Sequence, residues 1–422
     1  MAMQPWFGKA KLGIFIHYGI YAVNGIAESW SFFNGQISHE NYLKQLDGFT
    51  AARFDAKAWA ELFEAAGARY AVLTSKHHDG VALYDTAVSE LSTVKATPAR
   101  RDVVREYVDA LRERDLRVGI YFSHLDWTHP DYASVRPSSM DASERGNPFG
   151  VPAAGDEDPA AWQRFLDFHR AQLTEILERF APDLLWFDGD WERDPEQWRM
   201  DEVRGLIHRS NPEAVINGRM QGGFGDYSTP EQGVPIEPPP GEWELCLTLN
   251  DSWGYQHDDD NYKSIRQLIR IFAETIGGGG NLLLDVGPRE DGTIPEPQAD
   301  RLRALGAWIR KHEIAVYDTG RGLPAGHFYG PSTISDDRRR LYLFCFDRPN
   351  EYVVVRGLKN AVVRARIVGD DQDLRHERVG GLGEVPGWEY IYIDDFGLDP
   401  HCTVIELELD GELATYREHT RD

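Results

Sequence analysis

Cysteine, positive charge and long apolar runs are all scarce in this sequence of 422 residues. The three cysteines, Cys246, Cys345 and Cys402, are far apart and show no Cys/His ligand spacing, which argues against a disulfide framework or a zinc site. The formal net charge of −24 argues against nucleic acid or an anionic membrane as partner, because both require a positive surface. No apolar run approaches the roughly 18 residues of a membrane span. A soluble protein with a neutral ligand fits these absences best.

The N-terminus also lacks a feature, because no basic region is followed by an apolar stretch. As the sequence stands, we therefore expect a cytoplasmic protein. A signal peptide removed before this sequence begins would leave the same pattern, and the protein would then be secreted or periplasmic.

Most of the chain alternates short apolar runs with amphipathic stretches, as in a parallel sheet with crossover helices. The predicted strands are Leu12–His17, Arg69–Ser75, Arg117–Ser123, Asp183–Asp188, Ala214–Arg219, Trp243–Leu249 and Asn281–Gly287. Helices are predicted around Trp59–Ala66 and over Arg101–Asp115, Pro159–Phe180, Tyr262–Ile276 and Glu296–Lys311. Because polar residues follow the strands all round the set, we predict an α/β fold with a TIM-like (β/α) barrel of seven or eight units, rather than an open doubly wound sheet.

The pattern changes to period-two segments after about Tyr317, and no long helix follows. The predicted strands there are Leu341–Phe346, Tyr352–Val355, Val362–Ile367, Tyr390–Ile393 and Thr403–Leu409. We therefore predict a catalytic barrel over residues 1–316 and an antiparallel β-sandwich over residues 317–422. The role of the sandwich stays open between sugar binding and stabilisation.

The run from Leu184 to Asp188 ends abruptly in a carboxylate followed by Gly189. In a barrel of parallel strands, the C-terminal end of each strand faces the active-site mouth. Asp188 is therefore the first candidate for chemistry.

Three histidines also lie at predicted strand ends, namely His17 after the first strand and His77 and His78 after the second. Histidine and aspartate can bind a divalent metal, but HxH and HExxH spacings are absent. Neutral imidazoles can instead bond the hydroxyls of a sugar, and nearby tryptophans such as Trp30 and Trp186 supply flat apolar faces. We expect sugar binding, with metal binding as the minority interpretation.

Glycoside hydrolysis needs a second carboxyl group beside Asp188. The loop after the strand that ends in Arg219 contains Glu231, in Thr229-Pro230-Glu231. Spacing alone does not single out this residue. The competing carboxylates are Glu28, Asp126, Asp190, Glu237 and Glu244.

Taken together, the motifs resemble those of the α-L-fucosidases of glycoside hydrolase family 29. The segments that carry the resemblance are Trp6–Gly8, Gly13–Gly19, Lys76–Gly80, Trp186–Gly189, Trp253–Tyr255, Gly278–Leu284 and Val286–Pro288. They occur in order over essentially the whole predicted barrel.

The resemblance implies a retaining exo-glycosidase that releases terminal α-L-fucose from oligosaccharides or glycoconjugates through a covalent intermediate, without metal or organic cofactor. It implies Asp188 as nucleophile and Glu231 as acid/base, with Glu244 as the main rival. The substrate-binding residues it implies are His17, Glu28, Trp30, His77, His78, Tyr121, Trp186 and Arg219. Barrels of this family often oligomerise. For Glu231 to hold a proton near neutral pH, its surroundings should be drier or more acidic than those of Asp188.

Several positions depart from the family pattern: Tyr18 replaces a commoner Trp, and Asp285 replaces a commoner Asn. The Thr-Pro-Glu and Trp-Gly-Tyr segments lean toward a preference for α1,3/α1,4-linked fucose. Three alternatives stay open: a non-catalytic glycan-binding protein on the same fold, a barrel glycosidase for a related sugar such as galactose, and a metal-dependent hydrolase.

Overall fold

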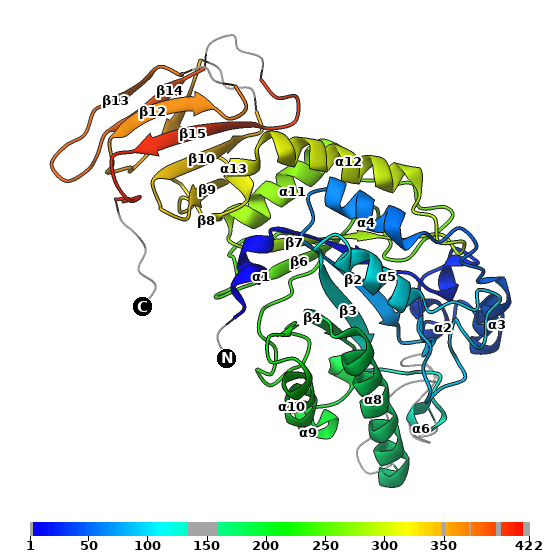
Figure 1. The fold of residues 1–422 in the computed structure, drawn as a ribbon. Helices are drawn as coiled ribbons and strands as arrows, with labels where there is room; N and C mark the ends of the chain where they lie inside the picture. Colours follow the sequence, from blue (N-terminus) through cyan, green and yellow to red (C-terminus); the bar gives the residue numbers. More distant parts are fainter. Residues whose placement is uncertain (1–2, 134–157, 348–350, 371–372, 394–397, 417–422) are drawn as a thin grey trace.

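The computed structural model describes residues 3–133, 158–347, 351–370, 373–393 and 398–416. Its N-terminal part contains a curved, seven-stranded parallel sheet with strand order β5-β4-β3-β2-β1-β7-β6 (Figure 1). The strands are β1 (Leu12–Ile16), β2 (Tyr70–Lys76), β3 (Arg117–Ser123), β4 (Leu184–Asp188), β5 (Val215–Ile216), β6 (Glu244–Thr248) and β7 (Asn281–Val286). Each lies within or one residue beyond an apolar run that predicts it.

Helices alternate with these strands along the chain. The longer ones are α4 (Ala56–Ala65), α5 (Val103–Arg112), α8 (Pro159–Phe180), α10 (Met200–Ser210), α11 (Ile265–Gly277) and α12 (Glu296–Lys311). Two begin later than predicted because a cap fixes the start: Asp102 accepts the N–H of Arg105, and Ser264 forms a capping box with Gln267. None of the helices in the described ranges is long and apolar enough to cross a membrane.

Shorter helical turns lie in the loops that connect the strands and the longer helices. They are α1 (Pro5–Ala10), α2 (Trp30–Phe33), α3 (His39–Leu43), α6 (Pro130–Ala133), α9 (Pro195–Trp198), α13 (Glu313–Val316), and the 3₁₀ turns η1 (Ile20–Ala22), η2 (Lys44–Gly48) and η3 (Asp190–Glu192). Several of them follow the C-terminal ends of strands, where they carry side chains of the candidate site.

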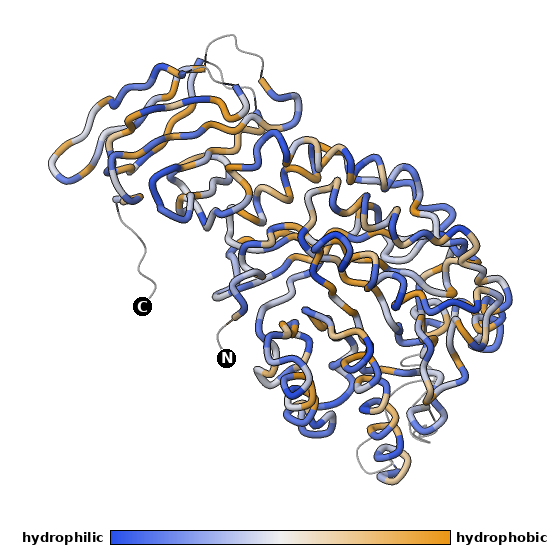
Figure 2. The backbone as a smooth tube through the Cα atoms, viewed as in Figure 1, coloured by the Kyte–Doolittle hydropathy of each residue, from blue (hydrophilic) through white to orange (hydrophobic). Residues whose placement is uncertain are grey.

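Residues along each strand of the parallel sheet alternate between two apolar clusters. Ile14 and Ile16 belong to the main core, which includes residues of the surrounding helices, whereas Phe15 belongs to a second cluster enclosed by the curved sheet. The enclosed cluster contains Phe7, Ala10, Phe15, Tyr70, Val72, Tyr121, Leu184, Trp186, Val215, Tyr227, Cys246 and Leu283. Burial of both faces explains why the strands are nearly continuous apolar runs, which appear as orange segments inside the molecule (Figure 2).

The predicted strand Ala214–Arg219 is too long, because β5 contains only two residues. Beyond it, the Asn217 side chain bonds to the backbone N–H and C=O of Phe187 at 2.8 Å each. A Cβ on Gly218 would lie 2.6 Å from the carbonyl oxygen of Tyr227. A close approach of residues 226–232 therefore replaces regular strand pairing here.

Residues 226–232 run between the two edge strands of the parallel sheet. On the β5 side, Asp226 donates its N–H to the carbonyl of Ile216 at 2.8 Å. On the β6 side, the N–H of Glu244 bonds to the carbonyl of Ser228 at 2.9 Å, and isolated parallel bridges pair Ser228 with Trp243 and Glu231 with Cys246. This segment therefore contacts both edges.

The C-terminal part contains a five-stranded sheet, β12-β15-β10-β9-β8, and a three-stranded sheet, β11-β14-β13. The strands are β8 (Thr319–Arg321), β9 (Ser332–Ser335), β10 (Arg340–Cys345), β11 (Tyr352–Val355), β12 (Val362–Ile367), β13 (His376–Val379), β14 (Trp388–Tyr392) and β15 (Thr403–Leu409). Both sheets are antiparallel and share one apolar cluster. The predicted β-strands are present, and β8, β9 and β13 are additional.

Helices α11 and α12 lie between the parallel sheet and the C-terminal strands (Figure 1). Trp308 of α12 donates its indole N–H to the carbonyl of Cys402 at 3.0 Å, and Phe344 and Val404 belong to the main core. The two parts therefore share buried contacts.

Candidate active site

Asp188, the last residue of β4, is held by two donors. The Tyr121 hydroxyl donates to Oδ2 at 2.9 Å, and Nη1 of Arg219 donates to Oδ1 at 2.8 Å. Only 12% of the side-chain surface of Asp188 is exposed. Both donors stabilise the ionised carboxylate, which is the form that can attack a substrate.

Gly189 makes the sharp turn that leaves Asp188 at the end of its strand. Its φ is +82°, a conformation that favours glycine, and a Cβ there would lie 2.5 Å from Cγ of Leu125. The backbone conformation and the lack of space for a Cβ therefore explain why glycine follows Asp188.

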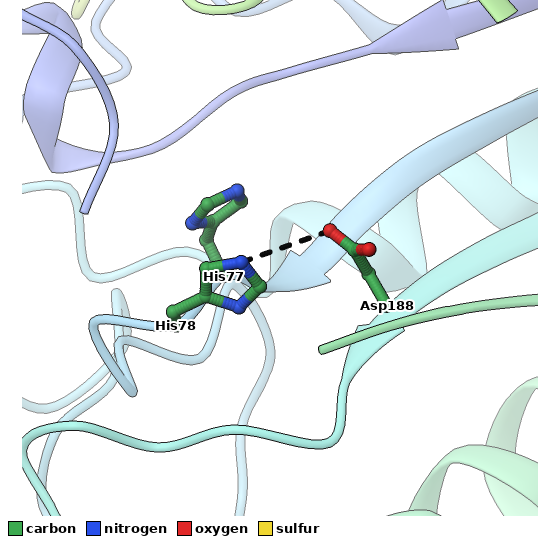
Figure 3. Close-up of side chains that lie close together, drawn as sticks. All are labelled: His77, His78 and Asp188. Carbon is green, nitrogen blue, oxygen red and sulfur yellow. Dashed lines mark ion pairs between the residues drawn. The ribbon is translucent and has the colours of Figure 1, made fainter. Parts of the chain in front are cut away.

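The three predicted histidines lie around Asp188, and Figure 3 shows His77 and His78 beside its carboxylate. Each histidine is anchored through Nδ1: His17 to Oδ1 of Asp285 at 2.7 Å, His77 to Oγ of Ser29 at 2.6 Å, and His78 to Oγ of Ser123 at 2.6 Å. Nε2 of His78 is buried without a hydrogen-bond partner among the described residues and lies 3.7 Å from Oδ2 of Asp188. This nitrogen is available to a ligand.

Burial lowers the pKa of His17, His77 and His78 well below the usual value, and the positive charge of Arg219 adds to the effect at His17 and His78. All three imidazoles are therefore neutral near neutral pH. Burial also raises the pKa of Asp285 well above its usual value, so its pair with His17 is favoured in the neutral form. A neutral imidazole can donate and accept, as hydroxyl groups require.

His77, His78 and Asp188 also place one ligand atom each within 4.8 Å of the others, a spacing that a metal ion could use. The guanidinium of Arg219 contacts the same carboxylate at 2.8 Å, and its positive charge opposes a bound cation. The donor set therefore suits a neutral polyhydroxyl ligand better than a metal.

Arg219 joins the two predicted catalytic carboxylates. Its Nη1 bonds to Asp188, and its Nη2 bonds to Oε2 of Glu231 at 2.5 Å. Glu231 keeps 40% of its side-chain surface exposed. The expectation of drier surroundings for Glu231 is therefore wrong in this ligand-free state, because the residue lies on a loop at the mouth and is paired with a cation.

Glu244, the rival, lies in the interior instead. Glu244 is the first residue of β6, whereas Asp188 is the last residue of β4. The Glu244 side chain is completely buried. Its carboxylate accepts the N–H of Trp186 at 2.9 Å and the hydroxyls of Tyr227, at 3.2 Å, and Tyr70. Burial raises the pKa of Glu244 to about 7.

Of the remaining predicted residues, Trp30 is half-buried, and Glu28, Tyr121 and Trp186 are buried. Tyr121 stacks on His77 with ring centroids 5.6 Å apart, and Trp30 meets His78 edge-on at 5.7 Å. Glu28 is 5% exposed, accepts the N–H of Gly254 at 3.4 Å, and has a pKa raised by burial. Trp186 belongs to the enclosed cluster and is 2% exposed.

Of the other competing carboxylates, Asp126 pairs with the fully buried Lys76 at 3.4 Å. Sequence reasoning missed Ser29, Ser123 and Asp285, which anchor the histidines. Ser123 and Asp285 carried a signal of position, because both lie at or near the C-terminal end of a predicted strand, whereas Ser29 carried none.

Comparisons with known proteins identify the family of this chain. Residues 1–313 match the family model described as alpha-L-fucosidase. Human plasma alpha-L-fucosidase is 32% identical over 344 residues, which cover 75% of this chain and 70% of that protein.

Solved structures are similar over nearly the whole chain. Alpha-L-fucosidase isoenzyme 1 from Paenibacillus thiaminolyticus has a TM-score of 0.85 and 32% identity, covering 96% of this chain and 98% of its own. A trapped covalent intermediate of a family 29 alpha-L-fucosidase from Bacteroides thetaiotaomicron has a TM-score of 0.82 and 25% identity, covering 96% and 95%. Because the family model matches residues 1–313, well over half of the sequence, the chain belongs to the alpha-L-fucosidase family.

Proposed function

We propose that this protein hydrolyses terminal α-L-fucosides with retention, with Asp188 as nucleophile and Glu231 as acid/base. The observation that carries the assignment is the guanidinium of Arg219, which contacts both carboxylates at 2.8 and 2.5 Å. One guanidinium can bridge two carboxylates only when they are close together. Both carboxylates therefore lie at one site, and retention is supported by the similar family 29 alpha-L-fucosidase from Bacteroides thetaiotaomicron, whose covalent intermediate has been trapped.

In the first step, Asp188 attacks the anomeric carbon of fucose and the bond to the leaving oxygen breaks. Glu231 gives its proton to that oxygen, and a fucosyl ester forms on Asp188. In the second step, Glu231 removes a proton from water, which attacks the ester and releases fucose. The partial exposure of Glu231 supports this role, because the residue must reach both the departing alcohol and the incoming water.

Arg219 keeps Glu231 paired while the site is empty. An entering substrate places its glycosidic oxygen between the carboxylates, where Glu231 can give a proton to it. Geometry in a ligand-free enzyme is often looser or differently paired than in the substrate complex.

Fucose binding is assigned to the neutral histidines. His17, His77 and His78 are fixed through Nδ1, so each can present its other nitrogen to a sugar hydroxyl. Glu28, Trp30, Tyr121 and Arg219 complete the proposed pocket. Trp186 is assigned a place below this pocket rather than in its wall.

We also infer that residues 226–232 close the parallel sheet into a barrel. Their hydrogen bonds to β5 and β6 support this role, as does the presence of Tyr227 in the enclosed cluster. The proposed domains are a catalytic barrel over residues 1–316 and a β-sandwich over residues 317–422. The proposed substrate is a fucosylated oligosaccharide or glycoconjugate, and a preference for α1,3/α1,4 linkages stays a prediction.

The assignment is tested by release of 4-nitrophenol from its α-L-fucoside and by a panel of α1,2-, α1,3- and α1,4-fucosylated oligosaccharides. We expect turnover by the wild type and a loss of several orders of magnitude in Asp188→Ala. Unchanged turnover in Asp188→Ala would remove the proposed nucleophile. Fucose binding without any wild-type turnover would favour the glycan-binding alternative.

A further inference from the structure

Trp186 lies against both of the groups that hold Asp188. The guanidinium of Arg219 lies over its indole ring at 4.7 Å from the centroid, and the ring of Tyr121 stacks on it at 5.8 Å with an interplanar angle of 17°. These two side chains supply the hydrogen bonds to Oδ1 and Oδ2 of Asp188. A tilt of the indole would therefore shift both donors.

The indole is oriented by its one polar atom. Nε1 of Trp186 donates to Oε1 of Glu244 at 2.9 Å. Glu244 is in turn held by the hydroxyls of Tyr70, from β2, and Tyr227, from the segment after β5. The carboxylate therefore joins β2, β4, β6 and residues 226–232 beneath the mouth.

A carboxylate is an expensive group to bury here, yet it suits these partners. Its two oxygens can accept three donors, whereas a glutamine would offer one oxygen and place an NH₂ group against a donor. Arg219 is the charged group that favours the ionised form of Glu244, whereas burial raises the pKa of the nearby Cys246 thiol and keeps it neutral. Apolar residues could fill the same space at a lower free-energy cost of burial. The presence of an acid at this position therefore points to a role beyond packing.

We propose that Glu244 is a positioning residue for fucoside hydrolysis, which fixes the plane of Trp186 and, through it, Arg219 and Tyr121 at the nucleophile. This inference rests on the proposed role of Asp188. It assigns to Glu244 a function that needs no contact with substrate.

The test is a double-mutant cycle with Glu244→Gln, Trp186→Phe and the double variant. Trp186→Phe keeps an aromatic ring but removes the N–H. We expect each single change to lower kcat by about 10²-fold, because small misplacements of catalytic groups have effects of this size, with little change in KM. Both changes remove the same hydrogen bond, so the double variant should fall no further than the worse single variant.

Asp183→Asn is the matched control. Asp183 precedes β4 and also accepts three donors, from Arg112 at 2.6 Å, Arg117 at 3.0 Å and the N–H of Val118 at 2.8 Å. None of these three donors is Trp186. We expect this variant to unfold more easily but to keep the wild-type kcat.

Two results of the cycle would overturn the proposal: a wild-type kcat in Glu244→Gln, or effects of the single changes that multiply in the double variant. Rescue of Glu244→Ala by azide would also overturn it, because Glu244 would then be the acid/base. Should Glu244→Gln fail to fold, as judged by circular dichroism, kcat of Trp186→Phe decides the matter alone. Failure of the proposed function would be seen separately, as activity surviving in Asp188→Ala.

Discussion

Glu231 and Glu244 come from one short stretch of chain but occupy opposite environments. Glu231 lies on a loop, 40% exposed, with Arg219 as its partner. Glu244 begins β6, is completely buried, and has three donors on its carboxylate. We propose that Glu231 serves proton transfer, whereas Glu244 serves positioning.

On the proposed assignment, access to the substrate, rather than an altered pKa, identifies the acid/base. Burial raises the pKa of Glu244 to about 7, a value that would suit a proton donor near neutral pH. Its oxygens are nevertheless occupied by Tyr70, Trp186 and Tyr227 beneath the mouth, so substrate has no route to them. Glu231 has that access.

The largest contrast is expected from Glu231→Ala. Hydrolysis of an oligosaccharide, whose leaving alcohol needs a proton, should fall by about 10²–10⁴-fold, whereas an aryl fucoside with an acidic phenol should be affected much less. Azide should restore turnover and give fucosyl azide of retained configuration. Kinetics across a series of leaving groups measures this effect. The same dependence in Glu244→Ala instead would reverse the two assignments.

Arg219→Lys tests the bridge between the carboxylates. Lysine lacks the planar fork that contacts two groups at once, so we expect kcat/KM to fall by about 10²-fold. Arg303 provides a matched control, because it also contacts two carboxylates, Glu296 and Asp300, but on the surface of α12. Arg303→Lys should leave kcat/KM unchanged. Equal effects of the two substitutions would argue against a specific role of the Arg219 bridge.

A smaller effect is expected on stability. Because burial raises the pKa of Glu244 from 4.5 to about 7, the folded state binds this proton more tightly than the unfolded state. The resulting stabilisation is complete below the unfolded value and is lost as pH rises through about 7. It amounts to about 3 kcal/mol.

Urea unfolding at about pH 5 and about pH 8 measures this contribution. The unfolding free energy of the wild type should fall between these values by more than that of Glu244→Gln. Groups common to both proteins, such as Asp79, whose pKa burial raises to about 6, cancel in the difference. Parallel pH profiles would contradict the buried, raised-pKa state of Glu244.

The strands of the parallel sheet were predictable because both of their faces are buried, which imposes continuous apolar runs. Residues 226–232 escaped prediction as a sheet element because they include Asp226, Ser228 and Pro230. Their hydrogen bonds to β5 and β6 depend on tertiary proximity, which leaves no periodic signal. Strands β8 and β9 were missed for a similar reason, since Thr319–Arg321 and Ser332–Ser335 contain few large apolar residues.

The residues of the candidate site also include some that were predictable from the sequence and some that were not. Asp188 and the three histidines were predictable from their positions at strand ends, whereas the partners of the histidines were not. Ser29 lies in a loop, and nothing in its local sequence distinguishes it, whereas Ser123 ends a predicted strand but does not show from sequence which histidine it contacts. Asp285 appeared only as a departure from a commoner asparagine. Its raised pKa offers a physical reason, because a neutral carboxyl, like an amide, can both donate and accept.

The central claim is that Asp188 forms the covalent intermediate. The most direct test is incubation with 2-fluoro-fucosyl fluoride followed by mass spectrometry of the proteolytic peptides. The account predicts one 2-fluoro-fucosyl ester, formed with loss of the anomeric fluoride and carried by the Asp188 side chain in the peptide that contains Trp186-Phe187-Asp188-Gly189. An adduct on Glu231 or Glu244, or fucose release that continues with no adduct formed, would contradict it.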